Sequence, residues 1–67
     1  MFKKYREENN YTQEELAEII EISFRQLQRI ENKESNPSVK TFRKLIKVLK
    51  ITDKDIANII KNELIEK

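Results

Sequence analysis

A helix-start signal recurs four times in this chain and constrains its fold more than any other feature. Each copy consists of an apolar residue, then Ser or Thr, then a second apolar residue four positions further on. The four hydroxyl residues are Thr12, Ser23, Ser38 and Thr52. Such hydroxyls cap the first free N–H groups of a helix, while the two apolar side chains pack together across the cap. The first two copies also carry Glu15 and Gln26 three residues after the hydroxyl, which completes a capping box.

These signals predict an all-α fold in a single domain that spans residues 1–67. A short helix is expected from Phe2 to about Glu8, and others follow each of the four capping residues. The last of them should run over about 53–65. The chain contains no glycine and one proline, which agrees with a helical protein. The helices after Thr12 and Ser23 are separated by only Glu21 and Ile22, so they should cross steeply as a helix-turn-helix over residues 12–31.

Apolar residues at helical spacing identify the expected core. The predicted core residues are Phe2, Tyr5, Leu16, Ala17, Ile20, Leu27, Ile30, Val39, Phe42, Leu45, Ile46 and Leu49. The fourth helix should therefore close the domain beneath the first three.

The helix after Ser23 has a polar face that could read DNA. With Leu27 and Ile30 turned inward, the remaining surface carries Phe24, Arg25, Gln28 and Arg29. Arginine can bond guanine bidentately, glutamine can bond adenine, and an apolar ring can meet a thymine methyl group in the major groove. These four residues are the predicted base contacts. The alternative is a solvated basic face with one exposed phenylalanine.

The charge distribution favours the same half of the chain. Residues 21–50 hold eight basic and three acidic residues, a balance of +5, although the net charge of the whole chain is only +2. Positive charge gathered on one part of a protein is typical of nucleic-acid binding. Within this region the predicted phosphate contacts are Asn32, Lys33, Ser35, Asn36 and Lys40. The alternative for these residues is a solvated loop.

The combined pattern resembles the helix-turn-helix domain of the phage Cro and repressor family, also called the XRE family. The resemblance runs from Phe2 to about Asp55. The matching residues are Arg6, Thr12, Gln13, Leu16, Ala17, Ile20, Ile22, Ser23, Leu27, Ile30, Glu31, Asn36, Pro37 and Ser38. It implies a compact five-helix domain with the lambda-repressor-like fold.

The resemblance also implies two roles outside the reading helix. Arg6 should form a structural ion pair with Glu31, and Gln13 should contact a DNA phosphate, with a possible further contact to a base or to the reading helix. The alternative for Gln13 is a plain exposed residue at a helix start. Glu21 and Lys33 replace frequent glycines of the family, so a left-handed backbone at either residue would be strained.

The last helix carries an apolar stripe that could join two copies of the chain. Its residues Ile56, Ile59, Ile60 and Leu64 recur at helical spacing. An uncovered stripe of this kind indicates a self-complementary interface, hence a homodimer. The alternative is that the stripe folds back onto the fourth helix.

Two function classes follow from these observations. The first is a sequence-specific DNA-binding transcriptional regulator of the repressor type, acting as a homodimer on double-stranded DNA with a pseudo-palindromic site. The second is a protein-interaction module, such as an antitoxin-like partner or a bridging cofactor. An enzyme is not expected, because the chain has no histidine, no cysteine and no glycine-rich phosphate loop. No metal, cofactor, small-molecule ligand or membrane contact is expected, and the absence of a signal peptide suggests the cytoplasm.

Overall fold

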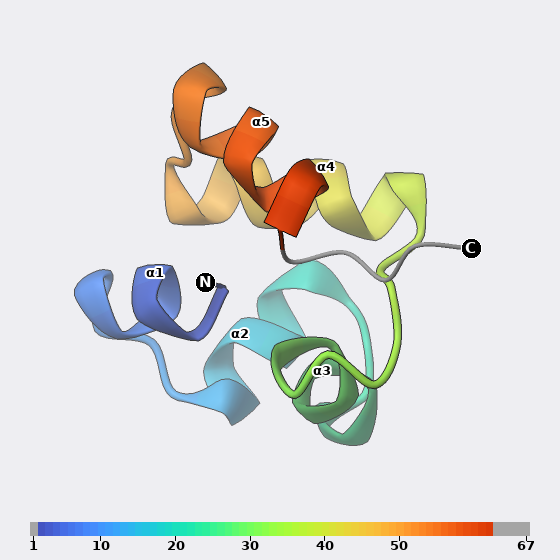
Figure 1. Cartoon of the computed structure of the whole chain (residues 1–67). Helices are drawn as coiled ribbons and strands as arrows, with labels where there is room; N and C mark the ends of the chain where they lie inside the picture. Colours follow the sequence, from blue (N-terminus) through green and yellow to red (C-terminus); the bar gives the residue numbers. More distant parts are fainter. Residues whose placement is uncertain (1, 63–67) are drawn as a thin grey trace.

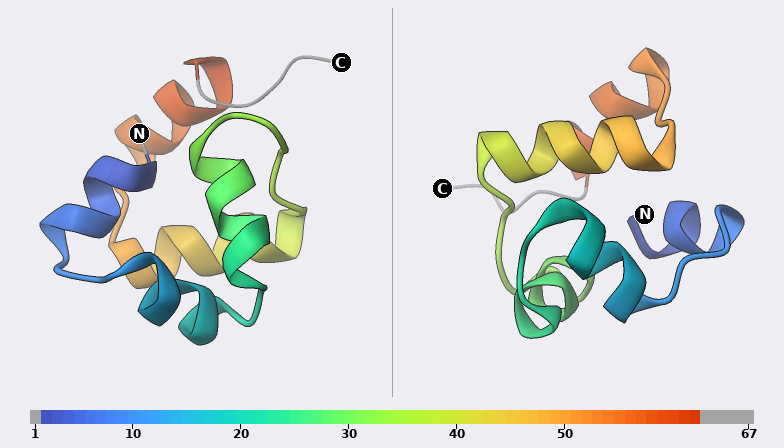
Figure 2. Two further views of the ribbon diagram at one scale, coloured as in Figure 1. Left: turned by 90° about the horizontal axis from the view of Figure 1, so that it is seen from below. Right: turned by 180° about the vertical axis from the view of Figure 1, so that it is seen from behind.

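The computed structural model describes residues 2–62, and within that range every regular element is an α-helix. The helices are α1 (Phe2–Glu8), α2 (Gln13–Ile20), α3 (Phe24–Glu31), α4 (Val39–Leu49) and α5 (Asp53–Asn62). Figure 1 shows α4 and α5 stacked over α1, α2 and α3. In the right-hand view of Figure 2, α3 lies on the side of the molecule opposite α5. The five expected helices are thus present, and the expectation of an all-α domain is confirmed.

All four predicted capping residues cap helices. Thr12 Oγ1 accepts a hydrogen bond from the Glu15 N–H at 3.1 Å, and Ser23 Oγ accepts one from the Gln26 N–H at 3.0 Å. Both capping boxes are complete, because the side chains of Glu15 and Gln26 accept the N–H groups of Thr12 and Ser23 in return. These bonds from Thr12, first from its backbone and then from its side chain, lower the pKa of Glu15. Ser38 and Thr52 cap α4 and α5 in the same way, because their side-chain oxygens accept the N–H groups of Thr41 and Asp55.

The ends of α1 to α4 share a second local feature, a left-handed residue that is not glycine. The four residues are Asn10, Glu21, Lys33 and Lys50, with φ angles of 62°, 61°, 60° and 55°. At Glu21 the following N–H, that of Ile22, bonds back to the carbonyl of Ala17 at 3.0 Å. This is the usual way to close a helix, but a side chain in this conformation costs about 1–2 kcal/mol. The left-handed backbone considered for Glu21 and Lys33 is present, and Lys50 adds a site that was not predicted.

The core lies between the two tiers of helices. Its buried members are Phe2, Leu16, Ala17, Ile20, Leu27, Ile30, Leu45, Leu49, Ile51 and Ile59. The rings of Phe2 and Phe42 meet edge to face with centroids 6.1 Å apart, which joins α1 to α4. The prediction for Val39 is wrong, since its side chain is 70% exposed. Val39 is the first residue of α4, where the helix has not yet reached the apolar surface of the other helices.

The apolar stripe of α5 is divided between the core and the surface. Ile59 is fully buried and Ile56 is half-buried against the core, whereas Ile60 remains 55% exposed. The expectation that Ile59 forms an interface between copies must be corrected, because this side chain packs inside its own domain. Leu64 lies outside the described residues. Only Ile60 among the described residues of the stripe presents its side chain to the surface.

Two polar contacts attach α1 to the upper tier. The Asn9 carboxamide nitrogen donates to the carbonyls of Tyr5 and Leu49, at 2.8 and 3.2 Å, and so joins the ends of α1 and α4. The Tyr5 hydroxyl and the Asp55 carboxylate at the start of α5 line one hollow, close enough to affect each other's ionisation. Hydrogen bonding between the two groups raises the pKa of Tyr5 to about 12 and lowers the pKa of Asp55. Neither contact was predicted, because no sequence spacing relates residues that are 40 or 50 positions apart.

Candidate DNA-binding surface

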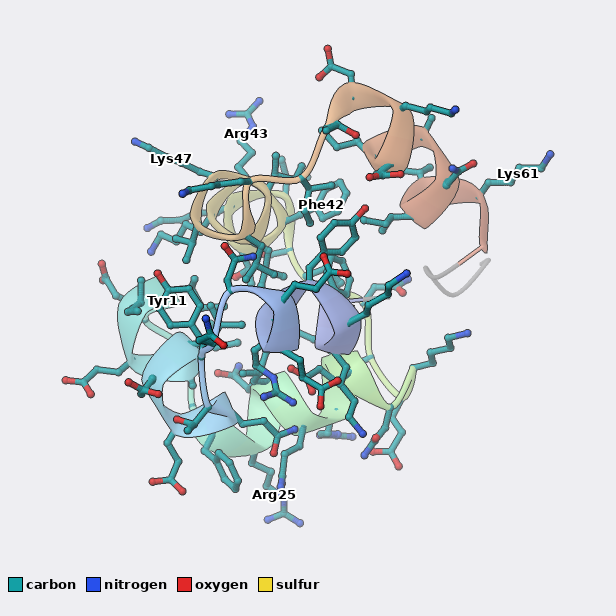
Figure 3. The ribbon with its side chains drawn as sticks, turned by 90° about the vertical axis from the view of Figure 1, so that its left-hand side faces the viewer. Tyr11, Arg25, Phe42, Arg43, Lys47 and Lys61 are labelled. Atoms are coloured by element: carbon teal, nitrogen blue, oxygen red, sulfur yellow. The ribbon has the colours of Figure 1, made fainter. Side chains whose placement is uncertain are left out.

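The outer face of α3 carries the four side chains predicted to read bases. Arg25 and Arg29 are exposed, Phe24 is 41% exposed, and Gln28 is half-buried. Figure 3 shows Arg25 projecting away from the body of the molecule. Neither guanidinium forms an ion pair with any residue of the range 2–62. Their donors are therefore available to a ligand outside the domain.

A buried ion pair holds the far end of α3. Arg6 Nε donates to Glu31 Oε2 at 2.8 Å, and Arg6 Nη2 donates to Glu31 Oε1 at 3.2 Å. The two side chains are only 10% and 2% exposed. The third donor, Arg6 Nη1, bonds the carbonyl of Tyr11 at 2.9 Å, just before α2 begins. One guanidinium thus fixes α3 relative to both α1 and the start of α2, and a paired geometry of this kind is strongly directional.

Gln13 is part of the same network. Its carboxamide nitrogen donates to Glu31 Oε1 at 3.0 Å, so the Glu31 carboxylate accepts three hydrogen bonds. Gln13 is the first residue of α2 and is half-buried. The amide carries a second hydrogen that can reach outward. Of the two further contacts considered for Gln13, a base or the reading helix, the structure has the contact with α3.

The loop after α3 forms a hollow beside the reading face. The hollow has a volume of about 300 Å³ and is lined by Ile22, Gln26, Arg29, Ile30, Ser35, Asn36, Pro37, Ser38 and Thr41. The predicted phosphate contacts Ser35 and Asn36 thus line the same hollow as Arg29. Lys40 is exposed in the first turn of α4, which has no acidic residue, and Asn32 and Lys33 are exposed where α3 ends.

The structure adds one residue to this surface that the sequence did not reveal. Lys44 Nζ donates to the carbonyl of Ile20 at 3.3 Å and lies 3.6 Å from Glu21 Oε1. The ammonium group therefore caps the negative end of α2, at the turn before α3. In the sequence, Lys44 looks like its surface neighbours on α4, so spacing alone could not distinguish it.

With this geometry, comparison with known proteins becomes informative. A family model described as helix-turn-helix matches residues 2–56. The chain belongs to the Cro and C1 type of helix-turn-helix family. Members of the helix-turn-helix family are DNA-binding regulators rather than typical enzymes, and the five-helix arrangement agrees with the lambda-repressor-like fold. Neither a curated protein nor a solved structure matches the chain.

Among residues 2–62, no three carboxylate, imidazole or thiol side chains gather into a group that could hold a metal ion. None of the helices in that range is both long and apolar enough to cross a membrane.

Proposed function

We propose that this protein is a sequence-specific transcriptional regulator of the repressor type that reads the major groove with α3. The observation that carries the proposal is the exposure of Arg25 and Arg29 on a short helix that is fixed at both ends. Ser23 caps its first turn, and the Arg6–Glu31 pair holds its last residue. A rigid support of this kind lets two guanidinium groups approach base edges at defined positions.

In this proposal each predicted contact has its own task. Arg25 and Arg29 bond guanine edges, while Gln28 and Phe24 contact the bases beside them. Asn32, Lys33, Ser35, Asn36 and Lys40 hold phosphates, together with the outward hydrogen of the Gln13 amide. Phosphate contacts set the position of the domain on DNA, and they make binding depend on salt.

The experiment begins with selection of bound sequences from random duplexes and then compares two variants on the selected site. We expect Arg29→Ala to weaken binding by about 1–3 kcal/mol and to relax the preference for one base pair. Lys61→Ala is the matched control, because it removes the same charge from an exposed position of α5, and Figure 3 shows Lys61 projecting from a different part of the molecule than Arg25. An equal loss for Arg29→Ala on random DNA would reassign Arg29 to a phosphate. If wild-type protein shows no salt-dependent binding to any duplex, the protein-interaction function is favoured instead.

We further propose that the regulator is a homodimer assembled on α5. The support is the exposed side chain of Ile60, which continues the apolar stripe beyond the buried Ile59. A dimer would place two copies of α3 about 34 Å apart, one helical turn of DNA. Sedimentation at micromolar concentration tests this: wild type should sediment as a dimer and Ile60→Asp as a monomer. A monomeric wild type would rule out the dimer while leaving the base contacts of α3 to be judged by the selection experiment.

A further inference from the structure

The outer face of α4 is positively charged and has no acidic residue. From Ser35 to Thr52 the sequence contains no Asp or Glu. Three exposed basic residues, Arg43, Lys47 and Lys50, follow one another at spacings of four and three. We call these three residues the α4 basic stripe. None of them forms an ion pair within residues 2–62.

The α4 basic stripe lies opposite the buried face of its helix. Successive residues of a helix turn by about 100°, so Arg43 and Lys47 fall within a sector of about 40°, and Lys50 follows them as the left-handed residue that ends the helix. Leu45 and Leu49, which are buried, lie on the other side. Lys44 is not part of the stripe, because its ammonium group is turned toward the end of α2. The stripe is about 10 Å long, given a rise of 1.5 Å per residue.

Arg43 and Lys47 of the stripe also project away from Arg25 on the surface proposed to read DNA. In Figure 3, Arg43 and Lys47 project from one side of the molecule and Arg25 projects from the other. The domain measures 26 × 23 × 19 Å. At physiological salt, charges more than about 8–10 Å apart are largely screened from each other. Among the basic residues of α4, Lys40 in the first turn is the one proposed to meet a duplex bound to α3, so Arg43, Lys47 and Lys50 should add little to the affinity of α3 for that duplex.

The duplex on α3 also cannot reach the stripe by bending. DNA has a persistence length of about 50 nm, far greater than the dimensions of this domain. The free energy needed to bend one duplex around a single small domain would thus be far larger than the free energy gained from three exposed ionic contacts. Any anion that meets the stripe must belong to a different molecule or to a distant segment of the same DNA.

We propose that the α4 basic stripe binds the phosphate backbone of a second DNA segment, so that one protein bridges two duplexes. Along one strand a phosphate occurs about every 3.4 Å of helix axis, so the stripe spans about three phosphates. The stripe contributes no residue to the hollow beside the reading face, nor to the one lined by Lys4, Tyr5, Glu8 and Asp55. A membrane-binding helix needs a broad exposed apolar face beside its charges, and α4 exposes only Val39 among its large apolar residues.

The inference goes beyond the proposed function and predicts a weak, salt-dependent contact without base specificity. Each phosphate contact adds about 0.9 to the slope of log affinity against log salt. The first duplex raises the local concentration of the second when both belong to one DNA molecule. Bridging is therefore expected at low salt and lost as salt increases.

The experiment captures one duplex with another. A mixed-sequence duplex is immobilised, wild-type protein is bound to it, and retention of a second, fluorescent duplex is measured over a series of salt concentrations. The test variant is Arg43→Glu with Lys47→Glu, and the matched control is Lys3→Glu with Lys61→Glu. All four residues are exposed, and each double variant takes the net charge from +2 to −2. Binding of a single short duplex is measured in parallel for every protein.

We expect the test variant to capture the second duplex much more weakly than the control does, with the remaining capture measurable at the lowest salt concentrations, while it binds a single duplex as well as the control. The salt slope for second-duplex capture should be about two units shallower in the test variant than in the control. An equal loss in both double variants would show a general charge effect and overturn the proposal. So would a wild type that binds one duplex and never captures a second. Loss of single-duplex binding in the test variant alone would place the stripe within the first contact instead.

Two further outcomes distinguish other partners and other failures. Vesicles containing phosphatidylserine are tested with the same proteins. If they bind wild type but not the test variant, and no second duplex is captured, the stripe is a membrane surface and the proposal is wrong. If wild type binds no duplex at all, both the proposed function and the bridging contact fail, whereas single-duplex binding without capture refutes only the bridging contact.

Discussion

The carboxamide nitrogen of Gln13 lies 3.0 Å from Oε1 of Glu31, so the first residue of α2 is bonded to the last residue of α3. This contact connects the two helices of the motif at the ends farthest from the turn between them. A residue that was expected to contact DNA therefore also sets the angle between the helices. Its two roles can be separated by experiment.

Gln13→Ala should destabilise the domain by about 1–2 kcal/mol, because a hydrogen bond to a buried carboxylate is lost. Urea unfolding measures the change. In a Glu31→Gln background the same substitution should cost less, since the charged acceptor is gone, and the difference gives the coupling energy. Equal costs in the two backgrounds would mean that the 3.0 Å contact contributes nothing to stability.

Arg6→Met should be far more damaging. It leaves the Glu31 carboxylate, which is 2% exposed, without its charged partner, and removal of one member of a buried pair costs about 3–5 kcal/mol. A domain of this size has little more stability than that, so the variant should be largely unfolded at 25 °C by circular dichroism. Lys44→Met, which removes a more exposed contact, should cost only about 1 kcal/mol. If Arg6→Met cost no more than Lys44→Met, the Arg6–Glu31 pair would have to be regarded as an ordinary surface contact.

The interaction between Tyr5 and Asp55 should make stability depend on pH in two windows. The pKa of Asp55 is lowered in the folded state, so its contribution is present above its usual value near 3.8 and is lost as the pH falls through the folded value. The pKa of Tyr5 is raised from 10.0 to about 12, so its contribution is present below pH 10 and is lost as the pH rises toward 12. The stability difference between wild type and Tyr5→Phe should thus be constant from about pH 5 to 9 and shrink at both extremes. Denaturant unfolding over this range tests it, and NMR titration of Tyr5→Phe should show the pKa of Asp55 nearer its usual value.

Glu21→Gly should stabilise the domain by about 0.5–1 kcal/mol. Glycine removes the strain of about 1–2 kcal/mol at a φ of 61°, and its greater freedom in the unfolded chain cancels part of that gain. The matched control is Glu18→Gly, because Glu18 is also exposed but lies within α2. That control should lose about 1 kcal/mol. A loss of stability in Glu21→Gly would show that the contact with Lys44 outweighs the strain.

The sequence predicted most of what local physical chemistry determines. Each helix start depends on residues within five positions of one another, and all four predicted caps are present. Helical spacing also located most of the core, because residues on the same face of a helix tend to be buried together. It failed at the margins of this pattern: Val39 precedes the covered part of α4, and Ile59 lies where α5 meets the core.

The contacts between distant residues could not be predicted in the same way. Lys44 differs from Lys47 by less than one helical turn, yet only Lys44 reaches the end of α2. The bonds of Asn9 to Leu49 and of Tyr5 to Asp55 likewise depend on how whole helices are stacked. The exposed side chains of α3 were predicted together with their proposed task, but their contacts with bases remain a prediction that only DNA-binding measurements can test.

The anchoring of the motif from outside has a consequence for attempts to transplant it. Segment 12–31 is held at one end by Arg6 of α1 and at the turn by Lys44 of α4, and neither residue belongs to the segment. A graft of those twenty residues onto a foreign scaffold would carry its capping boxes but leave the Glu31 carboxylate without a cation. The smallest segment that can be transplanted with its contacts intact is therefore α1 to α4, because α1 and α4 supply the residues that hold the helix-turn-helix in place.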